Sequence, residues 1–207
     1  MSERKKFRIQ RALGIELPGL GKPGALEKRN YPPGQHGRSH KRSLSGFGSQ
    51  LREKRKPILH YGRRERQLRR FVRKARSFKP SNWIEGLIGL LELRLDSVVF
   101  RLGFARSIAA ARQLVSHGHI FVNRQRHTIG SMILRPGDIV RVSEKAALLD
   151  AMRSSLLSPR LPLPSFLQLQ NPETQDRGII LSVPDSRHVP FEFDKMQVAE
   201  YYAKRSV

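Results

Sequence analysis

The stretch RLDSVVFRLGFA, residues 94–105, together with ARQLVSHGHIFVN, residues 111–123, decides the fold of this chain. Apolar residues of the first stretch recur at the helical period, and Gly103 ends that helix. Ser107 is a suitable N-cap for a second helix, which reaches the histidines of the second stretch. The apolar period then drops to two at Ile120 and Val122. The order helix, helix, strand is therefore predicted for this part of the chain.

More short strands are predicted downstream. Apolar residues with a period near two occur at 129–133 and 139–142, and residues 136–138 (Pro-Gly-Asp) form a strong turn before the second group. The hairpin tip Asn123-Arg124 has no glycine, so it must reach positive φ without one or use a different turn. The rest of the tail is expected to form a helix over 145–157, a strand over 178–183 and a helix over 198–204.

The residues upstream are predicted to be helical and basic. One helix has an apolar face formed by Leu68, Phe71, Val72 and Ala75. Its other face carries cations and only one acid, Glu65, whereas a solvated helix surface normally mixes signs. A shorter helix over 50–56 is expected to end or kink at Pro57. A core helix begins near Ile84, with Asn82 and Glu85 as a reciprocal cap.

Charge is graded along the chain, which has 40 Lys and Arg, 17 Asp and Glu and a net charge of +23. Residues 1–80, here called the basic front, hold 24 basic and 5 acidic residues, residues 81–142 hold 8 and 4, and residues 143–207 hold 8 and 8. A solubility device spreads its charges, whereas a surface that binds a polyanion concentrates them. Nucleic acid is the expected polyanion, because phosphate contacts release condensed counterions.

Several other classes of protein are disfavoured. The chain has no cysteine, which excludes disulfides, thiol nucleophiles and cysteine zinc sites. No apolar stretch approaches the ~20 residues that span a bilayer. The charged N-terminus has no apolar segment behind it, so no secretory signal is expected. We also expect no cofactor, no metal, no small-molecule substrate and no membrane partner.

Residues 94–142 closely resemble the helix–helix–strand RNA-binding module of the small-subunit ribosomal protein S4 family. The family's N-terminal signature is similar to residues 31–37, its basic helical region to residues 51–67, and its C-terminal end to Glu200-Tyr201-Tyr202. The resemblance covers nearly the whole chain in the family's order. Many bacterial relatives carry a cysteine zinc cluster near the N-terminus, so this chain resembles the zinc-free form.

The resemblance implies an α+β fold, a mostly helical basic domain plus a small helix–helix–strand module with short antiparallel strands. We expect residues 1–46 to form a basic tail, extended or ordered by RNA; the alternative is a disordered tail that only adds solubility. Residues 47–92 are expected to form the helical rRNA-binding domain, completed by the tail at about 180–207. Residues 93–179 are then the second domain, which contains the module.

The resemblance also implies the function. Proteins of this family are structural constituents of the small ribosomal subunit that bind the 5′ domain of its rRNA and nucleate assembly. They lie beside neighbouring small-subunit proteins, near the side where mRNA enters, and influence decoding accuracy. We therefore expect a cytoplasmic ribosomal protein, or an organellar one, and no enzyme.

Candidate rRNA-binding residues are cations, their neighbours and capping groups, because arginine forks fit phosphates and helix N-termini accept them. In the basic front they are Arg4, Lys5, Lys6, Arg8, Arg11, His36, Arg52, Lys54, Arg55, Lys56, Tyr61, Arg63, Arg64, Arg66, Arg69, Arg70, Arg73 and Lys74. In the module they are Arg94, Arg101, Arg106, Ser107, Arg112, His117, His119 and Asn123.

Two alternatives remain open at this stage. Arg94-Leu95-Asp96 resembles a stretch of pseudouridine synthases, which suggests a modifying enzyme with Asp96 as its catalytic group; a cap or an ion pair with Arg94 is the favoured interpretation. The second alternative is a free RNA-binding regulator or a ribosome-rescue factor. His117 and His119 suggest a metal only weakly, because no third ligand lies close by.

Overall fold

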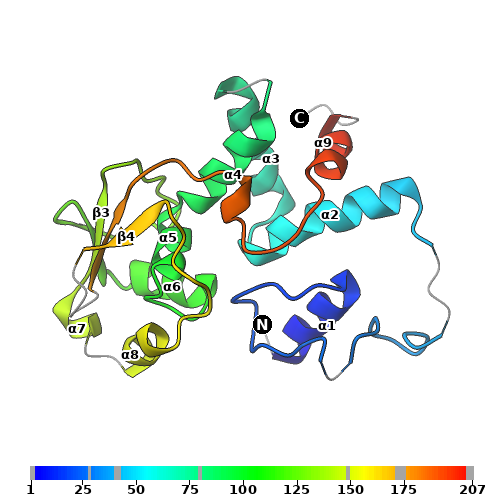
Figure 1. The fold of residues 1–207 in the computed structure, drawn as a ribbon, viewed down its shortest axis with the longest axis horizontal. Coiled ribbons are helices and arrows are strands. Elements are labelled where there is room, and N and C mark those ends of the chain that lie inside the picture. Colours follow the sequence, from blue (N-terminus) through cyan, green and yellow to red (C-terminus); the bar gives the residue numbers. More distant parts are fainter. Residues whose placement is uncertain are drawn as a thin grey trace. The chain divides into compact units, whose positions relative to one another are not determined.

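The computed structural model describes residues 3–27, 29–39, 43–78, 81–147, 150–170 and 176–203 (Figure 1). The contacts divide the chain into two compact units: unit 1 is residues 1–73 with 190–207, and unit 2 is residues 74–189. This division differs from the expected one. The helix at 83–92 groups with unit 2, and residues 180–189 do not join the first unit. The boundary falls inside one helix, after Arg73.

Unit 1 is helical. It contains α1 (Glu3–Leu13), α2 (Gly46–His60), most of α3 (Glu65–Phe78) and α9 (Lys195–Ala203). Helix α9 packs along α2, where the Lys54 ammonium lies 4.5 Å from the ring centroid of Tyr201. Polar pairs also join the two helices, with the Gln50 amide donating to Glu200 at 2.7 Å. These partners lie about 150 residues apart in sequence, so the pattern of neither helix alone predicts the pairing.

The expectation of an extended tail is wrong for residues 3–13, which form α1. Side chains hold the following loop against this helix. The Gln10 amide accepts from the Leu17 N–H at 2.8 Å and donates to the Leu20 carbonyl at 3.2 Å. Glu16 accepts from the Leu26 N–H at 3.0 Å. Polar side chains thus satisfy the backbone groups of this segment. Such hydrogen bonds leave no apolar period in the sequence, so the pattern did not predict them.

Helix α2 does not end at Pro57. It continues to His60, and the Tyr61 N–H bonds the Pro57 carbonyl at 3.0 Å. Proline removes one donor from a helix, but its own carbonyl still accepts. In α3, Leu68, Val72 and Ala75 are fully buried and Phe71 is half-buried, which confirms the predicted apolar face.

Unit 2 combines helices with one antiparallel sheet. Its helices are α4 (Trp83–Glu92), α5 (Leu95–Arg101), α6 (Ile108–Ser116), α7 (Glu144–Ala147) and α8 (Asp150–Leu157), and a 3-10 turn spans Ser186–His188. The strands are β1 (Ile120–Val122), β2 (Gln125–His127), β3 (Ile139–Val142), β4 (Leu167–Leu169) and β5 (Arg177–Ile180), in the order β2-β1-β3-β5-β4. This α+β architecture confirms the predicted fold class.

Several local predictions for unit 2 need correction. The Asn82 side chain makes no cap hydrogen bond, and Glu85 accepts instead from the Ser186 N–H at 2.7 Å. Residues 129–133 form no strand; a single bridge joins Ile133 to Arg94. Strands β2 and β4 were not predicted. The predicted helix at 145–157 contains α7 and α8, with residues 148–149 between them outside the described residues.

The Asn123-Arg124 hairpin reaches positive φ without glycine, at 49° and 72°. The Asn123 amide stabilises it by donating to Asp138 at 2.7 Å and accepting from the Ile139 N–H at 3.0 Å. Asparagine tolerates this conformation because its side chain bonds nearby backbone. Among the described residues, the Arg124 side chain makes no hydrogen bond that would offset its positive φ. The turn is therefore strained at its second residue.

Candidate RNA-binding surface

The exposed charged side chains of α3 are all positive. Arg64, Arg66, Arg70, Arg73 and Lys74 are all exposed there or immediately before the helix. Glu65 does not neutralise them as a group, because its carboxylate is 2.7 Å from the Lys54 ammonium and 3.4 Å from Nε of Arg69. The backbone of α3 thus holds guanidinium groups at fixed spacing, which suits a phosphate backbone.

Two candidates of the basic front are interior residues. Lys54 is 5% exposed and pairs with Glu65 and the Tyr201 hydroxyl, the latter at 3.2 Å. Tyr61 is 2% exposed and packs edge-on against His60, with 4.8 Å between ring centroids. Lys54 was selected as a cation of the basic helical region and Tyr61 as an aromatic residue beside it, but both fill the core of unit 1. They are removed from the candidate surface.

The N-terminal part of unit 1 contains a hollow with a basic lining. Arg11, His36, Arg52 and Arg55 line it, together with the other residues of 32–37. Arg11 donates to the Tyr31 carbonyl at 2.9 Å, and Arg52 donates to the Leu13 carbonyl through Nε at 2.9 Å and through its terminal nitrogen. Arg11 thus holds the start of the signature at 31–37, and Arg52 holds the end of α1.

Tyr31 lies between two arginines of this region. The guanidinium carbons of Arg11 and Arg38 are 4.7 and 5.1 Å from the centroid of its ring. A hydrogen bond from Arg38 lowers the pKa of the Tyr31 hydroxyl. Sequence reasoning missed Arg38, although it follows the signature directly.

The remaining candidates of the basic front stay at the surface. Lys5 and Arg8 are exposed, and Lys6, Lys56, Arg63 and Arg69 are half-buried. Lys56 is paired with Glu53 at 2.6 Å, and Arg63 donates to the Tyr61 carbonyl at 2.7 Å. The side chain of Arg4 lies outside the described residues.

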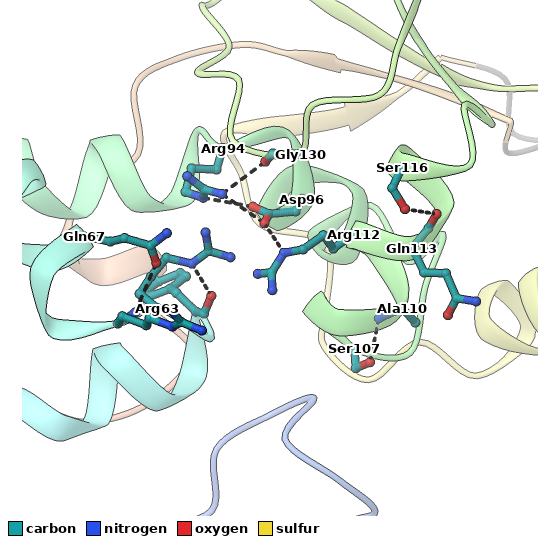
Figure 2. Close-up of polar contacts among 12 residues, drawn as sticks. Arg63, Gln67, Arg94, Asp96, Ser107, Ala110, Arg112, Gln113, Ser116 and Gly130 are labelled. Carbon is teal, nitrogen blue, oxygen red and sulfur yellow. Dashed lines mark hydrogen bonds and ion pairs between the residues drawn. The ribbon is translucent and has the colours of Figure 1, made fainter. Parts of the chain in front are cut away.

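Asp96 is the centre of an ion-pair network in the module (Figure 2). Its carboxylate is fully buried and accepts from Nε of Arg94 at 3.0 Å and from Nε of Arg112 at 3.1 Å. Arg94 also donates to the Gly130 carbonyl at 3.3 Å. Burial raises the pKa of Asp96, while the hydrogen bond from Arg94 acts in the opposite direction. The network ties α5 to α6 and to the loop before Leu134.

The two arginines around Asp96 differ in exposure. The side chain of Arg94 is 3% exposed, whereas that of Arg112 is 41% exposed. Arg101, the other buried arginine of the module, is 6% exposed, lies 3.5 Å from Glu92 and donates to the His188 carbonyl at 2.7 Å. Arg94 and Arg101 are therefore structural, which corrects their selection as RNA-binding residues, while Arg112 remains a candidate.

The other module candidates surround α6. Ser107 caps the helix, its hydroxyl accepting from the Ala110 N–H at 3.1 Å, as predicted (Figure 2). Arg106 is exposed and donates to the Ser154 carbonyl at 3.2 Å. His117 is exposed at the end of α6, and the ring centroid of His119 lies 6.2 Å from that of His117. Asn123 is exposed, but its amide is occupied in the hairpin.

The described residues contain no group of three metal-ligating side chains. Nor does any described helix have the length and apolar character needed to cross a membrane.

Two family profiles match consecutive parts of the chain. The profile described as ribosomal protein S4/S9 N-terminal domain matches residues 2–92, and the profile described as S4 domain matches residues 93–140. The chain belongs to the ribosomal protein S4 family. The predicted resemblance is thereby confirmed, and with it the expectation that the protein is a structural RNA-binding protein and no enzyme.

Individual relatives of this S4-family protein agree. Small ribosomal subunit protein uS4B of Bdellovibrio bacteriovorus is 48% identical over 200 residues, which cover 97% of this chain and 96% of the relative. Small ribosomal subunit protein uS4 of Methylobacillus flagellatus is 42% identical, with the same coverage of both chains. That of Thermosynechococcus vestitus is also 42% identical, again over 97% and 96%.

Proposed function

We propose that this S4-family protein is a structural constituent of the small ribosomal subunit that binds the 5′ domain of small-subunit rRNA directly. The observation that carries the proposal is the face of α3, where Arg66, Arg70 and Arg73 are exposed while Leu68 and Val72 on the opposite face are fully buried. A-form grooves expose little sequence to a protein, so phosphate contacts and shape dominate this recognition.

The binding surface of the proposal is the candidate set without its interior members. In the basic front it comprises the exposed and half-buried candidate cations of α1, α2, α3 and the turn before α3, together with His36. In unit 2 it comprises Arg106, Ser107, Arg112, His117, His119 and Asn123. The guanidinium groups of this set either lie exposed or bond carbonyls or carboxylates through part of their donors. Because arginine has five N–H donors, the bonded groups keep donors for phosphate.

The family context extends the proposal to assembly and decoding. We propose that the protein nucleates assembly, lies beside neighbouring small-subunit proteins near the side where mRNA enters, and contributes to decoding accuracy. It then works in the cytoplasm, or in an organelle if its ribosome is organellar.

Sucrose-gradient sedimentation of cell lysates tests the proposal. One copy of the protein per small subunit is expected, with constant stoichiometry during growth. A sub-stoichiometric amount that joins particles only under stress would indicate a free regulator or a rescue factor instead. Replacing exposed Arg66, Arg70 and Arg73 with glutamine is expected to lower incorporation, while the same exchange at Arg153 and Arg160 of unit 2 serves as the control.

A further inference from the structure

The two faces of the sheet in unit 2 differ in chemistry. Strand residues alternate between faces, and the buried ones, Ile120, Val122, Val140, Val142 and Ile180, share one face. The side chain of Leu102, the residue after α5, lies on that side, where it would meet a Cβ at Gly178. Phe121, Arg141 and Arg177 point to the opposite side and remain partly exposed. We call that side the outer sheet face.

Phe121, Arg141 and Arg177 form one continuous row across three strands. Phe121 is the register partner of Arg141, and Arg141 is the register partner of Arg177. The guanidinium carbon of Arg141 lies 5.2 Å from the centroid of the Phe121 ring. The next row along the strands is Ile139, Ile179 and Gln168, which is uncharged.

Few acidic groups offset the positive charges of Arg141 and Arg177 in this row. Like charges directly opposite one another on adjacent strands destabilise a sheet, and Arg141 and Arg177 have this arrangement. Within the described part of the chain, Nε of Arg177 has no hydrogen-bond partner, and it lies 3.6 Å from the Asp176 carboxylate. None of the described strand residues on the outer face is acidic. Arg126, opposite Phe121 on β2, donates to the Gly118 carbonyl at 2.9 Å and is held at the edge.

We propose that the outer sheet face is a second RNA-binding surface, which takes a single-stranded segment of RNA. Two adjacent arginines supply the charge for consecutive phosphates. The Phe121–Arg141 stack offers a ring and a guanidinium plane on which an unpaired base can continue the stack. A duplex has its base faces covered and cannot use that platform. The proposal rests on the proposed function, since it assigns a further contact to an RNA-bound protein.

The test uses the full chain and two RNA probes, a uridine-rich single-stranded oligonucleotide and a blunt duplex of equal phosphate number. Ultraviolet crosslinks to the oligonucleotide are expected in the peptide that contains Phe121. Phe121→Leu, which keeps an apolar side chain, is expected to weaken oligonucleotide binding about tenfold, within the range for lost base stacking. Its effect on duplex binding should be less than about twofold, because phosphate contacts are unchanged.

A charge-matched pair separates the face from the overall charge. Arg141→Gln with Arg177→Gln should weaken oligonucleotide binding more than Arg135→Gln with Arg153→Gln, which removes two exposed arginines elsewhere in unit 2. Equal losses for the two pairs, or no crosslink near Phe121, would overturn the proposal. The proposal would also be overturned if Arg141→Gln with Arg177→Gln bound RNA normally but entered subunits poorly. That result would mark the outer sheet face as a contact with another protein. If the wild-type chain binds neither probe, the proposed function fails as well.

Discussion

The buried Asp96 carboxylate accepts from Nε of Arg112 at 3.1 Å, and Arg112 is nevertheless 41% exposed. One end of this arginine side chain is therefore anchored in the interior of unit 2 while the rest lies at the surface. Arg94 binds the same carboxylate from inside, at 3.0 and 3.1 Å. Asp96 thus acts as a positioning residue for one cation at the surface and as the counter-charge of another in the core.

Asp96→Asn should destabilise unit 2 strongly. The variant leaves Arg94, which is 3% exposed, without its counter-charge, and breaking a buried ion pair costs about 3–5 kcal/mol. Urea denaturation with hydrogen exchange at α5 measures the loss. Asp176→Asn is the matched control, since its partner Arg177 is 42% exposed and such pairs contribute less than about 1 kcal/mol. Equal losses for both variants would contradict the assigned network.

Arg112→Ala should weaken RNA binding without unfolding the protein. The variant removes a phosphate contact, so the salt dependence of binding should become shallower by about one charge. Titration of rRNA at several salt concentrations measures both effects. Arg94→Ala provides the contrast, because it should lower the free energy of unfolding while the salt slope of the folded fraction stays unchanged. A salt slope unaffected by Arg112→Ala would remove this residue from the surface.

Arg124→Gly should stabilise the protein. Arg124 has φ of 72°, a conformation that costs an L-residue roughly 1 kcal/mol and glycine almost nothing. Part of the gain is offset by the larger entropy of glycine in the unfolded chain, so about 0.5 kcal/mol remains. Thermal denaturation measures it. Arg124→Ala removes the same charge but keeps the strain, and it should give no gain; a gain for alanine would mean that charge repulsion is responsible.

Tyr202 and Tyr31 should ionise far apart on a pH scale. Burial raises the pKa of Tyr202, and the carboxylate of Glu65 raises it further, whereas the hydrogen bond from Arg38 lowers the pKa of Tyr31. In near-ultraviolet titrations, Tyr31→Phe should remove a component that ionises below the usual tyrosine range, whereas Tyr202→Phe should leave that component in place.

The same shift of Tyr202 makes stability depend on pH. A group whose pKa is raised by folding stabilises the fold fully below its unfolded pKa, about 10 for tyrosine, and loses that contribution as the pH rises further. The free energy of unfolding should therefore fall above about pH 10, and fall less steeply in Tyr202→Phe. An identical alkaline decline in both proteins would contradict the burial of this hydroxyl.

Residues that pack by a regular period were predictable from the sequence. Leu68, Val72 and Ala75 follow the helical repeat, and the alternation at Ile120 and Val122 marks a strand buried on one side. Ser107 was predictable as a cap because its hydroxyl acts within one helical turn. These features depend on neighbours a few residues away, which is the range that a periodic pattern describes.

Features that depend on distant partners were not predictable. Lysine and arginine usually lie at the surface, but Lys54 is buried beside Glu65 and Tyr201. Arg94 is buried beside Asp96. Gln10 joins α1 to the backbone of the following loop, and Glu16 bonds the backbone of Leu26 within that loop; an apolar period reports neither contact. The outer sheet face was not predictable either, because Phe121, Arg141 and Arg177 come together only through strand register.

The salt dependence of binding to the 5′ domain of small-subunit rRNA tests the central claim most directly. If the cations of unit 1 and of the module neutralise roughly 10 phosphates, the logarithm of the association constant should fall against the logarithm of salt concentration with a slope of about −7 to −9. A slope shallower than about −3 would contradict the claim that this basic surface supplies the affinity.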